Sequence, residues 1–162
     1  MLCVKSVSFK TPLGTMIAMA DDHALYCLVF ADQLHANIKS FHVTEGTNAL
    51  TRSIQEELAQ YFAGTLKAFT TPLGFMGTAF QKTTWNALQQ ISYGETRAYV
   101  ELAHMIEKPT AFRAVANANG ANPIAIVVPC HRVIYSNGKL GGYSSGLPRK
   151  EWLLKHERDL AS

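Results

Sequence analysis

The segment that most restricts how this chain can fold is an apolar run between two prolines. Residues 124–128 are all aliphatic, and Pro123 and Pro129 enclose them. A short apolar run bounded by turn formers predicts a buried, extended segment. A cysteine, a histidine and an arginine follow Pro129 directly. The buried run therefore leads straight into a polar stretch that contains a thiol.

Cys130 is a candidate nucleophile. A buried cysteine is commonly an inert small hydrophobe, but here a rigid proline precedes it and two polar residues follow. The thiolate is the reactive form, and a free cysteine has a pKa of roughly 8.5, so the thiol needs a neighbouring base. His131 is the candidate base. Adjacent strand residues point to opposite sides, so a bridging water is the alternative to direct contact.

The two halves of the chain differ in charge. Residues 1–74 hold five Lys/Arg and six Asp/Glu, and residues 75–162 hold ten and six; the balances of −1 and +4 sum to the net +3. A basic excess fits a phosphate-bearing partner, and equally a solvated basic face. A connector at 65–77, with Thr, Pro and Gly, breaks the hydrophobic periodicity. We expect domains at 1–72 and 73–162.

The first half predicts a small sheet and one helix. Short apolar stretches near residues 4–9, 15–20 and 24–30, separated by turn residues, predict a meander of strands. Apolar residues at a spacing of four then predict a helix over 51–63, with a glycine at its end.

The second half predicts mainly helices. Thr78 and Gln81 form a capping-box pattern that opens the first helix. Two further helices, near 99–106 and 111–119, suggest a helix-turn-helix. The second of these is rich in alanine and carries Arg113. Its small side chains allow close approach either of another helix in the core or of a nucleic-acid groove.

Composition narrows the class of protein. Hydrophobic residues make up 48% and charged residues 17% of the chain, as in ordinary globular proteins. The three cysteines are an odd number and do not suggest a disulfide framework. We find no apolar leader at the start and no run of about 18 apolar residues. We therefore expect an intracellular protein without a membrane span.

The motif 129–134, Pro-Cys-His-Arg-Val-Ile, resembles the active-site motif of the O6-alkylguanine-DNA alkyltransferases. The resemblance is strong over 72–157 and looser over 1–71. Other residues that match the family's order and spacing are Phe80, Trp85, Gly94, Tyr99, Arg113-Ala114-Val115, Asn122-Pro123, Tyr143-Ser144 and Glu151-Trp152-Leu153-Leu154.

The resemblance implies an α+β fold. A small ribonuclease-H-like sheet-and-helix domain with a structural role would precede a mainly helical domain with a winged-helix-like helix-turn-helix. It also implies a cytoplasmic monomer without a cofactor, which repairs double-stranded DNA by moving the alkyl group of O6-alkylguanine irreversibly onto itself. Whether O4-alkylthymine is a second substrate is left open. The damaged base would be flipped out through the minor groove.

The resemblance also implies catalytic roles. Cys130 would accept the alkyl group, and His131 would activate it through a water, with Glu151 orienting the imidazole. The same glutamate, near a helix start, fits a simple interaction with the helix dipole. Asn122 would hold the turn between the recognition helix and the active site. Tyr99 would turn the target phosphate and support protonation of the departing guanine.

Further residues would bind DNA. Arg113 would enter the base stack, and Ala114 belongs to the slim helix that suits a minor groove only about 6 Å wide. Tyr143 would line the base pocket and Ser144 would bond near the guanine O6. The main chain at the reactive cysteine and at Val133 would read the amino edge of the base.

No metal is expected. Some relatives hold zinc in the N-terminal domain, but here Asp21 and Tyr26 stand where two ligands should lie. Cys3 and Cys27, with a nearby histidine, lack a recognised zinc spacing. Three other functions are alternatives. One is a recognition protein of the alkyltransferase-like kind, whose members lack the reactive cysteine, another is a helix-turn-helix regulator, and the third is an unrelated thiol hydrolase.

Overall fold

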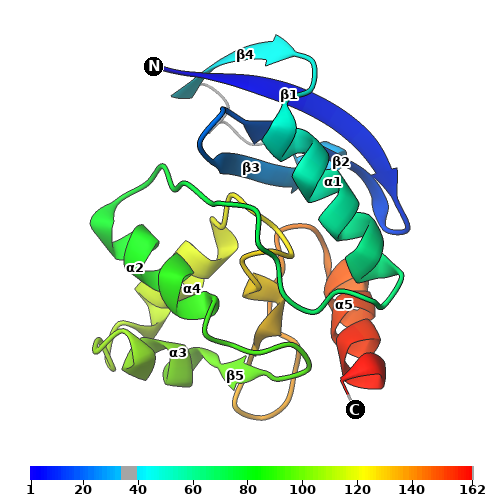
Figure 1. Cartoon of the computed structure of the whole chain (residues 1–162). Helices are drawn as coiled ribbons and strands as arrows, with labels where there is room; N and C mark the ends of the chain where they lie inside the picture. The colour runs from blue at the N-terminus through cyan, green and yellow to red at the C-terminus, as the bar shows by residue number, and fades with distance from the viewer. Residues whose placement is uncertain (34–39, 162) are drawn as a thin grey trace. The chain divides into compact units, whose positions relative to one another are not determined.

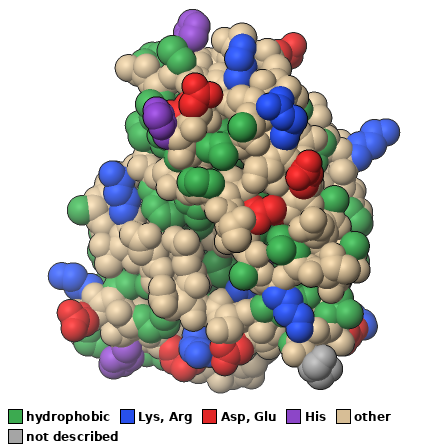
Figure 2. All heavy atoms as spheres, in the orientation of Figure 1, with side chains coloured by type: hydrophobic (Ala, Val, Ile, Leu, Met, Phe, Trp, Pro, Cys, Tyr) green, Lys and Arg blue, Asp and Glu red, His purple; other side chains and the backbone are tan. Residues whose placement is uncertain are grey.

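The computed structural model describes residues 1–33 and 40–161. The chain forms two compact units, Met1–Met76 and Gly77–Ser162. Together they make a mixed α+β protein, with the sheet in the first unit and most of the helices in the second (Figure 1). No helix among the described residues is long and apolar enough to cross a membrane. Basic and acidic side chains are interspersed on the face shown in Figure 2.

The first unit is built on a four-stranded sheet of order β3-β2-β1-β4. β1 (Leu2–Thr11), β2 (Gly14–Ala20) and β3 (Leu25–Phe30) form the expected antiparallel meander. β4 (Phe41–Glu45) pairs in parallel with β1 and was not predicted. A short 3-10 turn, η1 (Ala31–Gln33), follows β3.

Helix α1 (Ala49–Phe62) lies against this sheet and contacts β1 and β2 (Figure 1). Its capping box is made by Asn48 and Thr51, so it begins two residues before the prediction. Its inward side chains Ile54, Leu58 and Tyr61 are at most 1% exposed. The amphipathic spacing in the sequence therefore does mark the buried face of the helix.

The connector after α1 is tied to the sheet. Leu25 donates its N–H to the carbonyl of Pro72 at 2.8 Å, and Gly74 donates to the carbonyl of Leu25 at 2.9 Å. A Cβ atom at Gly74 would lie 2.3 Å from the ring of Tyr26, so the close pairing needs glycine. These bonds explain why the first unit extends past Pro72.

The second unit contains four helices and a small parallel ribbon among its described residues. The helices are α2 (Ala79–Leu88), α3 (Tyr99–Met105), α4 (Phe112–Gly120) and α5 (Leu147–Leu160). Strands β5 (Arg97–Ala98) and β6 (Val133–Ile134) form the ribbon, and η3 (Cys130–Arg132) precedes β6.

Helix α4 is held between α2 and α3. The capping box of Thr78 and Gln81 opens α2 as predicted. Trp85 of α2 is 1% exposed and donates its indole N–H to the carbonyl of Ala118 at 2.8 Å. Ala118 of α4 thus belongs to the core, while Arg113 and Ala114 lie on the exposed side. The core interpretation holds for the buried face of the slim helix, and the nucleic-acid interpretation stays a prediction for the exposed face.

The apolar run 124–128 is buried but not extended, so the prediction of an extended segment is wrong. Val128 donates to the carbonyl of Ile124 at 3.1 Å and Val127 to that of Ala125 at 2.8 Å, which closes tight turns. Ile126 takes a φ of 71°. This left-handed conformation is costly for a β-branched residue. Burial of the apolar side chains and the hydrogen bonds across the turn hold it in place.

Candidate active site

Cys130 begins η3 and lies at the wall of a cavity of about 320 Å³. The residue is 4% exposed. Asn119 and Ala116 of α4 line one side of the cavity, and Tyr143 and Ser144 line the other. The thiol is therefore shielded from bulk water yet borders a space of the size that holds small ligands.

Two asparagines at the end of α4 fix the backbone of the cysteine. Asn122 donates from Nδ2 to the carbonyl of Val128 at 2.7 Å and accepts from the N–H of Ile124 at 3.0 Å. Asn119 donates from Nδ2 to the carbonyl of Cys130 at 3.3 Å. Asn122 thus closes both ends of the turn that leads into the thiol, where the resemblance placed it.

The carboxylate beside His131 belongs to Glu157. Its Oε2 lies 2.7 Å from His131 Nε2, and the two side chains are 1% and 0% exposed. The expected partner, Glu151, is exposed on the first turns of α5. That expectation is wrong because residue 151 lies on the exposed side of α5. A spacing of three and four residues along the helix then brings Lys150, Leu153 and Glu157 to its buried face.

Arg132 holds the same carboxylate from another side. Its Nε lies 2.7 Å from Glu157 Oε1 and its Nη2 3.1 Å from Oε2. Its Nη1 donates to the carbonyl of Ile91 at 2.7 Å. Burial by itself would raise the pKa of Glu157, but His131 and then Arg132 outweigh it and hold the pKa below its usual value. The carboxylate is therefore ionised and rigidly placed.

His131 is a neutral base at physiological pH. Burial lowers its pKa below 6.5, against the opposing charge of Glu157. Because Nε2 faces a carboxylate, we assign the proton to Nε2, which leaves Nδ1 as the free acceptor. Among the described residues nothing bonds to the buried Nδ1. An imidazole in this tautomer can accept a proton from a thiol or a water.

The thiol of Cys130 needs such a base. Burial raises its pKa, although the side chain of Asn122 and the charge of Lys150 act against the shift. Lys150 donates from Nζ to the carbonyls of Val133 at 2.6 Å and Gly142 at 3.0 Å. Burial lowers the lysine pKa to about 8, opposed by the charge of the cysteine. The lysine thus ties two segments of the cavity wall together close to the sulfur.

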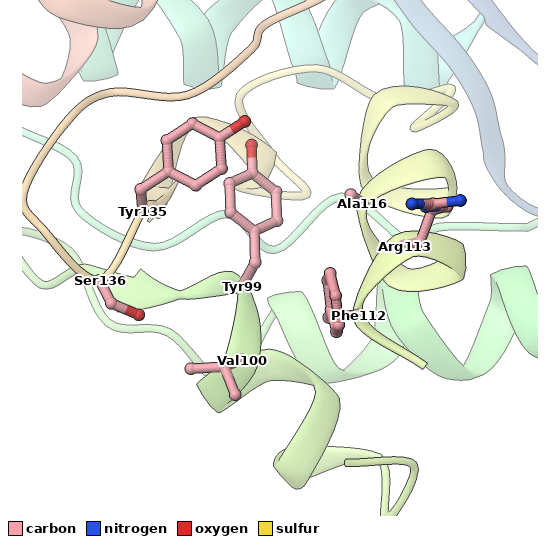
Figure 3. Close-up of a pocket in the computed structure, with 7 residues that line it drawn as sticks. All are labelled: Tyr99, Val100, Phe112, Arg113, Ala116, Tyr135 and Ser136. Atoms are coloured by element: carbon pink, nitrogen blue, oxygen red, sulfur yellow. The ribbon is translucent and has the colours of Figure 1, made fainter. Parts of the chain in front are cut away.

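Four of the remaining predicted residues line two neighbouring cavities, whereas Val133 is buried in β6 and Ala114 is exposed on α4, and neither lines these cavities. Tyr143 and Ser144 border the cysteine cavity. Tyr99 and Arg113 border a second cavity of about 330 Å³, shown in Figure 3. Burial raises the pKa of Tyr99 above 10.0, so its hydroxyl stays protonated at neutral pH.

Three polar residues of the site were not predicted: Glu157, Arg132 as its partner, and Lys150. The sequence does indicate two of them, because polar residues 150 and 157 share a helix face with Leu153. A polar residue on an apolar stripe is paired when buried. Tertiary packing decides which side of the helix is buried, and residues close in the sequence do not reveal it.

Comparison with known proteins agrees with the geometry. Residues 79–159 match the family described as 6-O-methylguanine DNA methyltransferase, DNA binding domain. A methylated-DNA–protein-cysteine methyltransferase of Methanosarcina acetivorans is 47% identical over 152 residues, which cover 92% of this chain and 95% of the relative. The chain belongs to the 6-O-methylguanine DNA methyltransferase family.

The similarity extends over both units. The methyltransferase of Salmonella typhimurium is 40% identical over 166 residues and 97% of each chain. The crystal structure of the Mycobacterium tuberculosis protein OGT in complex with DNA matches with a TM-score of 0.88 and 39% identity, over 97% of this chain and 94% of that one. The mixed α+β architecture is thus shared with solved members of this family.

Proposed function

We propose that this protein repairs O6-alkylguanine in double-stranded DNA by transferring the alkyl group to its own Cys130. The observation that carries the proposal is the buried thiol at a cavity, followed by a neutral His131 whose far nitrogen meets an ionised Glu157 at 2.7 Å. This set supplies a nucleophile, a base and an orienting carboxylate. The presence of the cysteine disfavours a recognition protein that only binds the lesion.

The reaction is a single displacement at the alkyl carbon. His131 Nδ1 takes the thiol proton, through a water, and the Cys130 sulfur attacks the carbon attached to O6. A carbon–sulfur bond forms, the carbon–oxygen bond breaks, and its electron pair leaves with the guanine. Tyr99, whose hydroxyl stays protonated, supports return of a proton to that guanine. The thioether is stable, so each molecule acts once.

The DNA geometry belongs to the same proposal. The exposed face of α4 enters the minor groove, and Arg113 fills the place of a flipped base; small residues such as Ala114 let the helix backbone come close. Unstacking a base costs a few kcal/mol and least when the pair is damaged. Tyr143 and Ser144 line the cavity that takes the extruded base, and the main chain at Val133 reads the amino edge of that base.

The finer features follow from the family resemblance. The second unit would be winged-helix-like around α3 and α4, and the first ribonuclease-H-like with a structural role. We infer a monomer that needs no cofactor. A protein that acts on chromosomal DNA works where the DNA is, and we propose the cytoplasm. O4-alkylthymine remains a second substrate to test.

The decisive experiment is intact mass after incubation with duplex DNA that contains O6-methylguanine. We expect a gain of about 14 Da, the mass of one methylene, at one equivalent and on the peptide with Cys130. Cys130→Ser should show no gain. Cys27→Ser is the matched control, because Cys27 is a half-buried thiol, with a pKa raised by burial to about 12, and should react like wild type. Binding of the damaged duplex without a mass gain would contradict the proposal.

A further inference from the structure

An exposed aromatic side chain stands directly before Arg113. Phe112 is the first residue of α4 and is 56% exposed, whereas Val115 in the same helix is fully buried. Two other large hydrophobic residues, Tyr135 and Val100, are 53% and 40% exposed and border the same cavity. Three exposed apolar side chains around one hollow are more than the scattered apolar residues found on any surface.

The cavity they share is walled by aromatic rings. It measures about 330 Å³, and Tyr99 of α3, Phe112 of α4 and Tyr135 after β6 come to it from three segments (Figure 3). The ring centroids of Tyr99 and Tyr135 are 5.3 Å apart with 46° between the planes. Rings that come from separate elements and meet in this way form a firm wall against which a flat group can stack.

The charges at this cavity favour an anion. Among the residues that line it, Arg113 is a cation, and the tyrosine hydroxyls and Ser136 are neutral; no carboxylate lines it. A nucleotide fits both features, since its base stacks on rings and its phosphate favours a surface with a cation and no carboxylate.

The position of the cavity indicates which nucleotide of the strand binds there. Ala116 lines both this cavity and the one at Cys130, so the two lie on either side of a single small residue. A flipped nucleotide stays linked through its phosphates to its neighbours in the strand. When the alkylated guanine occupies the cysteine cavity, a neighbouring nucleotide is therefore within reach of the aromatic one.

We propose that Phe112, with Tyr99 and Tyr135 behind it, forms a stacking site for the base next to the alkylated guanine in the same strand. This inference rests on the proposed function. The site holds the strand beside the flipped nucleotide and acts together with Arg113, which fills the gap. Stacking uses the flat face of the base, so the site accepts any sequence around the lesion.

The test measures affinity in the unreactive Cys130→Ser protein. The probe is a duplex with one O6-methylguanine. Phe112→Ala should weaken binding about 10- to 100-fold, the usual range for one lost base–aromatic stack, and Phe112→Trp should bind like the parent. Leu160→Ala, which removes a side chain 39% exposed on α5, is the control and should bind like the parent. Unchanged affinity of Phe112→Ala would overturn the inference and point to a protein partner for this face.

A second probe separates stacking from a general loss of binding. The base next to the lesion is removed, on the 5′ or the 3′ side, to leave an abasic sugar. If Phe112 stacks on that base, one of these duplexes binds the parent weakly, and Phe112→Ala causes no further loss. If Phe112→Ala lowers the affinity further for both abasic duplexes, the inference is overturned. This outcome counts even where Phe112→Ala binds poorly or is destabilised. The mass gain of the wild-type protein, measured separately, decides the proposed function itself.

Discussion

At the scale of single residues, the central feature is one carboxylate that serves two neighbours. Glu157 meets His131 at 2.7 Å and Arg132 at 2.7 and 3.1 Å. The arginine fixes the carboxylate, and the carboxylate fixes the tautomer of the imidazole. A buried charge without partners would be expensive, so this arrangement keeps an ionised group next to the thiol at little cost.

The two glutamates of α5 give a matched pair of variants. Glu157→Gln should slow alkyl transfer by about 100-fold or more, the usual contribution of a well-oriented base. It also leaves Arg132 unpaired, so thermal melting must be recorded beside the rate. Glu151→Gln, on the exposed side of the same helix, should transfer within about twofold of wild type. Equal rates for Glu157→Gln and wild type would contradict the role of the Glu157 carboxylate.

The pH dependence of the rate follows from His131. Its folded pKa lies below 6.5, so the imidazole is neutral and competent at pH 7 and becomes protonated only in more acidic solution. Single-turnover rates should therefore fall as the pH drops below 6.5. In Glu157→Gln the charge that raises the imidazole pKa is gone, and the acid limb should move to lower pH. A shift of the acid limb to higher pH would contradict this role of Glu157.

At the scale of elements, the turn between α4 and η3 decides where the thiol lies. Asn122 bridges the turn with one hydrogen bond to each end, and Ile126 takes an unfavourable left-handed backbone conformation within it. The helix before the turn carries the side chains that we propose to contact DNA, and the one after it begins with the cysteine. The turn therefore couples the proposed recognition surface to the nucleophile.

Asn122→Ala should damage both stability and rate. It leaves the N–H of Ile124 without this partner, at about 1–3 kcal/mol for an unpaired buried group. The carbonyl of Val128 loses one of two donors and keeps the N–H of Cys130. We expect urea unfolding at lower denaturant and a lower transfer rate. The control is Asn86→Ala, an exposed change on α2 that should alter stability by about 0.5 kcal/mol or less. A stable Asn122→Ala protein with wild-type rate would show that the bridge is dispensable.

At the scale of the whole molecule, the two units are stabilised by different buried carboxylates. Glu157 serves the second unit. In the first, Glu57 of α1 accepts the N–H of Thr70 at 2.7 Å and that of Thr71 at 2.9 Å, together with both hydroxyls. Burial would raise its pKa, but these bonds outweigh it and lower the pKa below 4.5. The bonds tie the connector to α1.

Glu57→Gln tests this tie. An amide offers one acceptor oxygen where the carboxylate offers two, and its NH₂ group would face backbone donors. We therefore expect the free energy of unfolding to fall by about 1–3 kcal/mol at pH 7. Since the folded pKa is lowered, the ionised group stabilises above pH 4.5 and this contribution disappears as the pH falls through the folded pKa. Urea unfolding at pH 7 and pH 3 should thus show a smaller difference between variant and wild type in acid. A constant difference would contradict the linkage.

Much of the architecture follows from local sequence patterns. The strands β1 to β3, the capping box of α2 and the apolar stripe of α1 depend on neighbours within a few residues, and so they could be predicted. Strand β4 could not, because its parallel partner β1 is about forty residues away and only the completed sheet supplies it.

The site divides in the same way. The sequence by itself determined the nucleophile and its base, because Cys130 and His131 are adjacent and their chemistry is intrinsic. Only the tertiary structure decided that Glu157, and not Glu151, orients the base. Packing of α5 against η3 decides which of its faces is buried, and a carboxylate can meet His131 only from that face. The fold likewise turned an apolar run that reads as extended into a tight, asparagine-bridged turn, because hydrogen bonds across it and burial outweigh the backbone preference of Ile126.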